Sequence, residues 1–256
     1  MRVTSVQLAM RDRPKEENVE YALGMIDQAP PSDLILLPEI WPSGFFSFDR
    51  YEPDSERLDG PIVKAFKEKA RDRNCHIFMG SMVEEHGGKL FNTSVFLNPA
   101  GEIAAQYRKI HLFGYQSKET AILTPGQDVV VSTTPWGITG FSTCYDLRFP
   151  ELFRRMIDQG AKFFLIASAW PQVRLEAWKL FNRCRAHENL AFLISCNCAG
   201  ANQEQKYAGH SMIVDPLGQV VTEGGDGEEL VHARIDPEFV DTVRQDFPAL
   251  QDRVLN

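Results

Sequence analysis

Cys144 is the residue whose type and surroundings point most directly to chemistry in this chain. It follows residues 137–143, which have the pattern of a short buried strand, and precedes Pro150, which suits the first position of a helix. A thiol at such a strand-to-helix turn faces backbone N–H groups and the positive end of a helix, which lower a cysteine pKa from about 8.5. A structural cysteine needs no such charged surroundings, yet three charged residues follow within seven positions: Asp146, Arg148 and Glu151. We therefore interpret Cys144 as a nucleophile.

Three further charged residues lie where strand-like runs end. Glu39 ends the apolar run at residues 33–39, Lys109 follows another strand-like run, and Glu119 lies in the loop just beyond it. Sites gather at the carboxyl ends of strands in α/β architectures. We therefore expect these three side chains and Cys144 to surround one cavity.

This set of side chains suits cleavage of an amide or a nitrile without an essential histidine. A thiolate that attacks such a carbon places negative charge on the attached oxygen or nitrogen. The ammonium of Lys109 and the backbone N–H of Tyr145 would stabilise that charge as an oxyanion hole. Glu39 would accept the proton of Cys144, pass it to the leaving ammonia and activate water for deacylation. Glu119 would hold the ammonium of Lys109 in position relative to the attacked amide or nitrile group, or would share the proton transfers with Glu39.

The composition argues against several classes of partner. The chain has 256 residues, 43% hydrophobic and 24% charged, with a formal net charge of -8 and no basic block. These values are typical of a globular protein with a sizeable core and do not favour a nucleic-acid or membrane surface. No apolar run approaches the roughly 20 residues of a membrane helix, and the N-terminus lacks the apolar segment of a signal peptide. We expect a cytoplasmic protein with a small-molecule substrate.

The cysteine pattern predicts free thiols in a reducing compartment. The five cysteines show no disulfide-like spacing, and Cys196-Asn197-Cys198 lacks the two-residue spacer and second pair typical of a zinc site. The pattern therefore predicts neither a metal nor another cofactor. Because no linker or low-complexity segment divides the chain, we expect residues 1–256 to form a single domain.

Strand and helix patterns alternate along the whole chain. Strands are predicted at residues 3–9, 33–39, 76–83, 90–97, 103–107, 129–132, 137–143, 163–168, 192–197, 212–215, 219–222 and 230–235. Helices are predicted at residues 16–28, 61–73, 151–159 and 175–189. Segments 97–103 and 214–220 share an Asn/Asp-Pro-x-Gly turn, which predicts two hairpins and two related halves. Mixed strands with paired helices favour an α/β (α+β) fold, a four-layer αββα sandwich of two mixed β-sheets with the helices outside.

Three segments resemble the signature blocks of the nitrilase superfamily of carbon-nitrogen hydrolases. They are Leu37-Pro38-Glu39, segment 107–113 (Tyr-Arg-Lys-Ile-His-Leu-Phe) and segment 144–151 (Cys-Tyr-Asp-Leu-Arg-Phe-Pro-Glu). The resemblance extends from about residue 7 to residue 236. It implies an αββα fold, a thioester intermediate and frequent homodimers. It also implies a Glu-Lys-Cys triad with a second glutamate, falling on Glu39, Lys109, Cys144 and Glu119.

Within this superfamily, the sequence is most similar to the ω-amidase branch associated with methionine salvage and glutamine-transaminase products. The similar segments are 168–171 with Arg174, 196–200 and 208–211. The resemblance implies hydrolysis of the terminal amide of 2-oxo acid amides, such as 2-oxoglutaramate, with release of ammonia.

Substrate contacts are predicted from residues near the strand ends. A substrate with a free carboxylate requires a bidentate cation, and Arg174, just after a strand end, is the candidate. The predicted aromatic walls of the pocket are Trp41, Phe45, Tyr145 and Trp170. We interpret Arg148 and Glu151 as a structural ion pair behind the nucleophile rather than as substrate contacts.

Three alternatives are open from the sequence alone. One is a Cys-His hydrolase with a papain-like mechanism, in which His111 or His210 is the base. Another is an N-carbamoyl-amino-acid amidohydrolase or a nitrilase of the same superfamily, although the short loop between Phe113 and Glu119 favours small acids. The third is a non-catalytic binding protein with this fold, in which Cys144 would be no more reactive than free cysteine.

Overall fold

Two six-stranded β-sheets form the centre of the computed structural model, which describes residues 1–255. The first sheet has the order β15 (Glu229–Arg234), β1 (Arg2–Gln7), β3 (Leu34–Leu36), β4 (His76–His86), β5 (Lys89–Leu97), β6 (Ile103–Arg108). The second has the order β14 (Val220–Glu223), β13 (Met212–Val214), β10 (Phe192–Asn197), β9 (Phe163–Ser168), β8 (Gly137–Thr143), β7 (Val131–Thr134). A small third sheet contains β12 (Gln205–Lys206), β11 (Ala199–Asn202) and β2 (Ala9–Met10).

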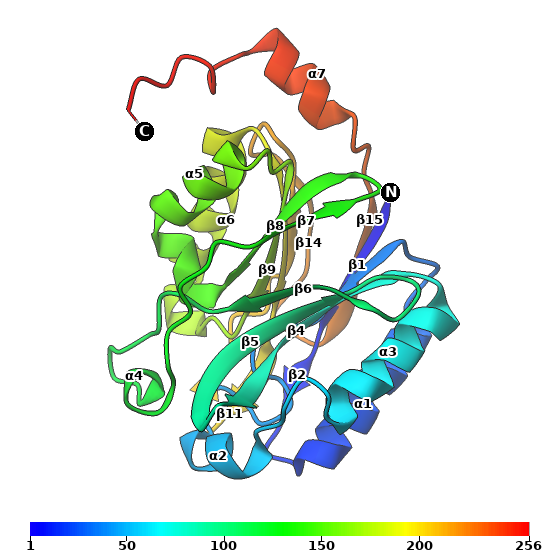
Figure 1. Cartoon of the computed structure of the whole chain (residues 1–256), viewed down its shortest axis with the longest axis vertical. Helices are drawn as coiled ribbons and strands as arrows, with labels where there is room; N and C mark the ends of the chain where they lie inside the picture. The colour runs from blue at the N-terminus through cyan, green and yellow to red at the C-terminus, as the bar shows by residue number, and fades with distance from the viewer. Residues whose placement is uncertain (256) are drawn as a thin grey trace.

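Helices cover the outer faces of the two large sheets. α1 (Lys15–Gln28) and α3 (Pro61–Arg73) pack together over the first sheet. α5 (Pro150–Asp158) and α6 (Leu175–Asn189) pack together over the second. The sheets face each other through β1 against β10 and β4 against β9. Figure 1 shows the helix pairs on opposite sides of the strands. The predicted αββα sandwich is confirmed.

Both large sheets have the same strand pattern. Each contains three parallel central strands, β1, β3 and β4 in the first sheet and β8, β9 and β10 in the second. An antiparallel strand borders this core on one side, and an antiparallel pair borders it on the other. The chain therefore contains two halves of one topology, as the turn motifs predicted.

The two predicted hairpins are present and have equivalent turns. They join β5 to β6 and β13 to β14. The backbone N–H of Gly101 donates to the Asn98 carbonyl at 2.9 Å, and that of Gly218 donates to the Asp215 carbonyl at 2.9 Å. Both glycines have positive φ, +73° and +75°, a conformation that a side chain would disfavour.

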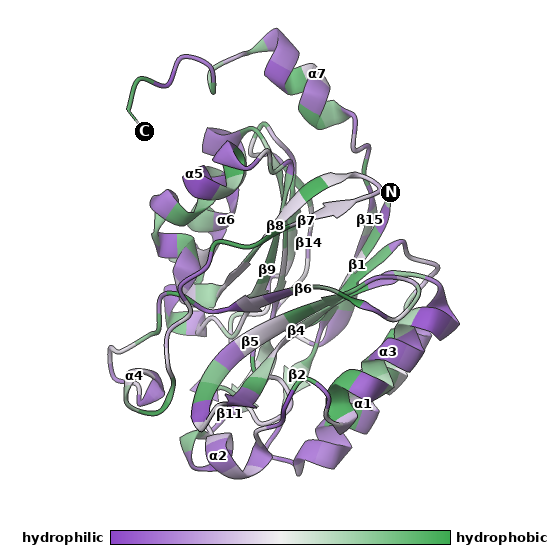
Figure 2. Cartoon of the chain, viewed as in Figure 1, coloured by the Kyte–Doolittle hydropathy of each residue, from purple (hydrophilic) through white to green (hydrophobic). Residues whose placement is uncertain are grey.

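Burial explains the composition of the central strands. Every residue of β9 is buried, because α5 and α6 cover one face and the first sheet covers the other. A strand covered on both faces is expected to be a continuous apolar run, whereas a surface helix has one apolar stripe. Figure 2 shows this contrast, with green predominating along the central strands and purple along the outward helix faces.

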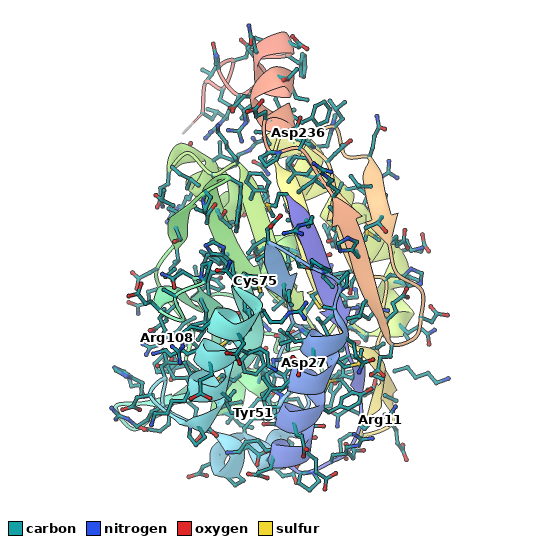
Figure 3. All side chains as sticks on the ribbon, turned by 90° about the vertical axis from the view of Figure 1, so that its right-hand side faces the viewer. Arg11, Asp27, Tyr51, Cys75, Arg108 and Asp236 are labelled. Atoms are coloured by element: carbon teal, nitrogen blue, oxygen red, sulfur yellow. The ribbon has the colours of Figure 1, made fainter. Side chains whose placement is uncertain are left out.

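The helix pair over the first sheet shows how local sequence sets helix ends. α3 begins with Pro61 at its first position and ends at Asn74, whose φ of +47° forms a left-handed C-cap. Asp27, labelled on α1 in Figure 3, forms an ion pair with Lys69 of α3 at 2.6 Å. Among the helices within residues 1–255, none combines the length and apolar character needed to cross a bilayer.

Several elements differ from the sequence predictions. β3 ends at Leu36 rather than at residue 39, and the predicted loop at 113–128 contains the short helix α4 (Glu119–Ile122). The third sheet was not predicted, because β2 pairs through two residues with β11, about 190 positions away. Pairing at that separation leaves no local periodicity in the sequence. The helices α2 (Tyr51–Asp54) and α7 (Phe239–Asp246) were also missed.

α7 lies beyond the sandwich near the C-terminal end of the molecule, as Figure 1 shows. Arg244 of this helix donates hydrogen bonds to the carbonyls of Leu190 at 2.9 Å and Ala161 at 2.8 Å. These contacts attach α7 to the edge of the second half.

Candidate active site

The four residues predicted to react come together from both halves of the molecule. Glu39 lies just beyond β3, Lys109 directly follows β6, and Glu119 begins α4. Cys144 begins a 3-10 helix directly after β8. The exposed fraction is 8% at Cys144 and at most 1% at the other three.

Lys109 joins the two glutamates into one buried ion cluster. Its Nζ lies 2.8 Å from Glu39 Oε1 and 3.0 Å from each carboxylate oxygen of Glu119. The ring of Phe45 lies 5.3 Å from the same nitrogen. Burial alone would lower the pKa of Lys109, but the two carboxylates outweigh burial and raise this pKa above its usual value. Lys109 is therefore a permanent cation at neutral pH.

N–H donors fix both carboxylates of the cluster. Asn92 Nδ2 donates to Glu39 Oε1 at 2.9 Å and to Glu119 Oε1 at 3.1 Å. The remaining oxygens accept backbone hydrogen bonds, Glu39 Oε2 from Ala169 at 2.9 Å and Glu119 Oε2 from Phe113 at 2.6 Å. Burial raises the pKa of Glu119, although Lys109 acts in the opposite direction. Sequence reasoning missed Asn92, a polar residue in the buried part of β5.

The nucleophile and the first glutamate both lie at strained turns. Cys144 has a φ of +48°, in the left-handed region that is uncommon for residues with a side chain. Ile40, directly after Glu39, has a φ of +42°. A capping box formed by Thr143 and Asp146 stabilises the turn at Cys144. Such a strained backbone persists only where the surrounding structure enforces it, and it is common at functional sites.

The surroundings of Cys144 raise the pKa of its thiol, which contradicts the prediction of a lowered pKa. Burial and the charge of Glu39 raise the thiol pKa above its usual value, and Lys109 and the backbone N–H of Ala169 only partly oppose this. The expected helix, α5, begins at Pro150, and the 3-10 helix separates it from the thiol. Activation of the thiol therefore requires a base.

Asp146 joins the Lys109 segment to the turn of the nucleophile. Its Oδ1 accepts a hydrogen bond from the backbone N–H of His111 at 3.0 Å and lies 2.7 Å from His111 Nδ1. Its Oδ2 accepts a hydrogen bond from the Tyr107 hydroxyl at 2.6 Å. Burial and Asp146 raise the pKa of Tyr107, which keeps the phenol a donor. Because Tyr107 and His111 flank Lys109, one carboxylate positions Lys109 relative to Cys144.

A cleft of about 350 Å³, including its open mouth, leads to Cys144. Four predicted substrate residues line it: Phe45, Tyr145, Trp170 and Arg174. The prediction for Trp41 was wrong. Its Nε1 donates to the Met79 carbonyl at 2.7 Å and its ring packs 5.4 Å from Phe66, so it belongs to the core of the first half.

Arg148 also lines the cleft, and the predicted ion pair with Glu151 was wrong. Within residues 1–255, no ion pair joins these two side chains. The Arg148 guanidinium instead lies 5.1 Å from the ring centres of Trp170 and Phe181, while Glu151 is exposed on the first turn of α5. The opposite charges of Arg148 and Glu151 suggested an ion pair, but Arg148 lies in the 3-10 helix, which directs its side chain towards the aromatic rings.

The histidines considered as bases do not line the cleft. The ring of His111 bonds to Asp146, and the ring of His210 lies between two carboxylates outside the Lys109 cluster. This arrangement gives no support to a Cys-His hydrolase. Among residues 1–255, no group of three or more His, Cys, Asp or Glu side chains is suited to hold a metal ion.

A cysteine beside a buried lysine-glutamate cluster, at the strand ends of an αββα sandwich, is the arrangement of a hydrolase that acts through a thiol. A model of the carbon-nitrogen hydrolase family matches residues 2–245. The chain therefore belongs to the carbon-nitrogen hydrolase family, and the resemblance seen in three short segments is confirmed. This membership makes the protein an enzyme and sets aside the non-catalytic alternative.

Individual relatives agree with this membership. A 2-oxoglutaramate amidase of Paenarthrobacter nicotinovorans is 35% identical over 246 residues, covering 93% of this chain and 84% of that protein. A 2-oxoglutaramate amidase of Bacillus subtilis (strain 168) is 34% identical over 238 residues, covering 92% of this chain and 91% of that protein. The crystal structure of Saccharomyces cerevisiae Nit3, a member of branch 10 of the nitrilase superfamily, matches with a TM-score of 0.90 and 30% identity, covering 100% of this chain and 97% of that chain.

Proposed function

We propose that this enzyme hydrolyses the terminal amide of a small carboxylate, a 2-oxo acid ω-amide of the 2-oxoglutaramate type, through a Cys144 thioester. The observation that carries the proposal is the buried cluster of Lys109 with two glutamates beside a thiol at the end of a small cleft. The names of the Paenarthrobacter and Bacillus relatives support the choice of substrate.

Glu39 is the base of the first half-reaction. The thiol of Cys144 gives its proton to Glu39 while sulfur attacks the amide carbon, which forms a tetrahedral intermediate with a negative oxygen. Lys109 and the backbone N–H of Tyr145 stabilise this oxygen. The N–H of Tyr145 belongs to the first turn of the 3-10 helix, where backbone donors lack helical partners. Glu39 then protonates the leaving nitrogen, the C–N bond breaks, and ammonia departs from the thioester.

Water completes the cycle in the second half-reaction. Glu39 accepts a proton from water as its oxygen attacks the thioester carbon, and Lys109 again faces the developing oxyanion. The C–S bond breaks and the sulfur regains the proton from Glu39. Glu119, bound to Lys109 through both oxygens, keeps the ammonium in place throughout. The products are ammonia and a carboxylic acid.

The cleft favours a short substrate with one polar end. The space of about 350 Å³ includes open solvent, so the enclosed part of the cleft can hold only a small molecule. Phe45, Tyr145 and Trp170 provide apolar walls, and Arg174 provides a cation that can bind a carboxylate.

Ammonia release from three substrates tests the proposal. Wild-type enzyme and a Cys144→Ala variant would be incubated with 2-oxoglutaramate, N-carbamoyl-β-alanine and a simple nitrile. We expect release from 2-oxoglutaramate at a rate that exceeds the others at least tenfold, and no release by the variant. Preference for the carbamoyl compound or the nitrile would assign the enzyme to another reaction of the same family.

A second experiment distinguishes the glutamate base from a histidine base. Thioester formation would be followed by intact-protein mass in Glu39→Gln, His111→Ala and His210→Ala variants. Loss of acylation in Glu39→Gln alone supports the mechanism. Acylation that persists in Glu39→Gln but disappears in a histidine variant would support the Cys-His alternative.

We also infer that the enzyme works in the cytoplasm as a homodimer or a higher homo-oligomer. All five cysteines are free, which suits a reducing compartment. The homodimer follows from the family resemblance, and light scattering on the purified protein would test it. A monomer of 29.0 kDa in solution would contradict it.

A further inference from the structure

Ser168, the last residue of β9, has a buried hydroxyl that the mechanism above does not use. The residue is completely buried, and within residues 1–255 no group forms a hydrogen bond with its Oγ. Most buried polar groups are hydrogen-bonded, because a buried group without a partner lowers stability. An unpaired hydroxyl that is kept next to a reactive group is suited to a partner that forms only during the reaction.

The strand register places Ser168 beside the nucleophile. β8 and β9 are parallel, with Thr143 opposite Ala167, so the next residues along the two strands are Cys144 and Ser168. The Ser168 hydroxyl lowers the pKa of the Cys144 thiol, although burial and Glu39 raise this pKa more strongly. A neutral hydroxyl lowers the pKa of a thiol by donating a hydrogen bond to its ionised form. The hydroxyl and the sulfur are therefore neighbours across adjacent strands.

The backbone holds Ser168 in a fixed position outside the substrate-binding surface. Its carbonyl accepts hydrogen bonds from the backbone N–H groups of Glu39 at 3.2 Å and Cys198 at 3.0 Å. Among the described residues, those that line the cleft include Ala169 but not Ser168. The hydroxyl is therefore held next to the sulfur without forming part of the wall that a substrate contacts.

The charge on the sulfur decides whether this hydroxyl has a partner. The sulfur of a neutral thiol is a weak acceptor, which agrees with the unpaired Oγ of Ser168. A thiolate instead accepts a charge-assisted hydrogen bond, which is shorter and stronger. The hydroxyl is therefore satisfied only after Glu39 has taken the proton of Cys144. A hydrogen bond that strengthens on the way to the transition state lowers the barrier.

We propose that Ser168 is a further catalytic residue, whose hydroxyl donates a hydrogen bond to the Cys144 thiolate as it forms and again as it leaves the thioester. The proposal rests on the proposed function, because both steps belong to that mechanism. Ser168 keeps its own proton throughout, and Glu39 remains the base. The titratable groups that act on the sulfur, namely Glu39, Lys109, Tyr51 and Cys198, keep their charges when this neutral hydroxyl is removed.

Alkylation of Cys144 by iodoacetamide tests this role without any substrate. Rates at pH 8 would be followed by mass spectrometry of the peptide that contains Cys144. Loss of the hydrogen bond lowers the fraction of thiolate, while the remaining thiolate becomes more nucleophilic and offsets about half of the loss. We therefore expect Ser168→Ala to react about three- to tenfold more slowly than wild type.

Ser142→Ala is the matched control. It removes another buried hydroxyl without a partner, from the strand that leads to the nucleophile. Its alkylation rate should equal that of the wild-type enzyme. A loss in Ser142→Ala as large as that in Ser168→Ala would mean that both changes act through packing, and would overturn the proposal.

A pair of variants with the same shape isolates the hydroxyl itself. Ser168→Thr and Ser168→Val both add a methyl group, but only threonine retains a hydroxyl. Ser168→Thr should be alkylated about three- to tenfold faster than Ser168→Val. Equal rates in this pair, or a wild-type rate in Ser168→Ala, would contradict the role of Ser168.

Thermal denaturation distinguishes this role from a structural one. Because the hydroxyl has no partner in the folded enzyme, Ser168→Ala should match or slightly exceed the melting temperature of wild type. A marked loss of stability, or failure of Ser168→Ala to fold, would show that the hydroxyl supports packing and would overturn the proposal.

Hydrolysis of two amides separates the failure of this proposal from the failure of the proposed function. In Ser168→Ala, kcat/KM for 2-oxoglutaramate and for uncharged butyramide should fall by the same factor, because the hydroxyl acts on the sulfur. A loss confined to one amide would make Ser168 a substrate contact and overturn its role at the thiolate. A wild-type enzyme that releases ammonia from neither amide, but whose alkylation depends on Ser168, would overturn the proposed function instead.

Discussion

The two halves of this enzyme share one strand pattern but provide different chemistry at their strand ends. The ends of β3 and β6 in the first half provide Glu39 and Lys109. The ends of β8 and β9 in the second half provide Cys144 and the segment that leads to Trp170 and Arg174. A common topology therefore places side chains at one edge of the sandwich without deciding what they do.

The difference between the halves lies in how their polar groups are satisfied. Every carboxylate oxygen of the first-half cluster has a donor within 3.1 Å, so the cluster is closed and rigid. The second half instead leaves the guanidinium groups of Arg148 and Arg174 facing an open cleft. In the proposed mechanism, the first half therefore moves protons, and the second half binds and attacks the substrate. Asp146 and the N–H of Ala169 connect the two.

The largest effect should follow from removing the nucleophile of the second half. Cys144→Ala should lower kcat by at least about 10⁴-fold, since no other group can form the thioester. Its melting temperature should stay within a few degrees of wild type. Cys184→Ala, at a half-exposed thiol on α6, is the control and should retain activity. Appreciable turnover by Cys144→Ala would assign the thioester to another residue.

Removing the cation of the first half should affect both rate and stability. Lys109→Ala should lose about 3 kcal/mol of transition-state stabilisation, the scale of one oxyanion donor. It should also lower the free energy of unfolding by about 3 to 5 kcal/mol, because two buried carboxylates lose their partner. Steady-state kinetics and urea denaturation measure the two effects. Lys162→Ala, which removes a surface ion pair with Asp241, should change neither. A wild-type rate in Lys109→Ala would refute its catalytic role.

The carboxylate that connects the halves should contribute strongly to stability. Asp146→Ala should lower the free energy of unfolding by about 3 kcal/mol, because buried donors of Tyr107 and His111 lose their acceptor. Urea denaturation would measure this change against Asp158→Ala, an exposed carboxylate paired with Arg253. If the two variants were equally stable, Asp146 would not be the connection between the halves.

The buried thiol should make stability depend on alkaline pH. The folded pKa of Cys144 is raised, so above about pH 8.5 the unfolded chain loses a proton that the folded chain retains. The unfolded state then binds fewer protons, and the free energy of unfolding falls as pH rises, by about 1.4 kcal/mol per unit for each such thiol. Cys196 and Cys198 are shifted in the same direction.

Denaturation between about pH 9 and pH 10.5 isolates the contribution of the nucleophile. Cys144→Ala should reduce the slope of stability against pH by about 1.4 kcal/mol per unit. An unchanged slope would mean that Cys144 is already ionised in the folded enzyme.

The smallest effect should come from the open end of the cleft. Arg174→Ala should raise KM for carboxylated amides about threefold to tenfold, because a solvent-screened cation contributes little to binding. The KM for butyramide should stay unchanged. Equal changes for both substrates would remove Arg174 from the substrate site.

The sequence by itself determined the four long helices, the main strands, the two hairpins and the four polar residues that the fold brings together at the cleft. These features depend on short-range patterns, namely the periodicity of apolar residues, the Asn/Asp-Pro-x-Gly turns and charged residues placed directly after buried strands. Such patterns are local, so they can be detected without knowing what each segment contacts.

Only the tertiary structure decided the raised pKa of Cys144, the direction of Arg148 and the pairing of β2 with β11. Each depends on groups that are distant in the sequence. The thiol pKa is raised by burial and by Glu39, more than 100 positions earlier in the chain. The cleft that receives Arg148 includes Trp170, which follows a different strand. Electrostatics and packing act through space, and the chain order of the residues does not record those distances.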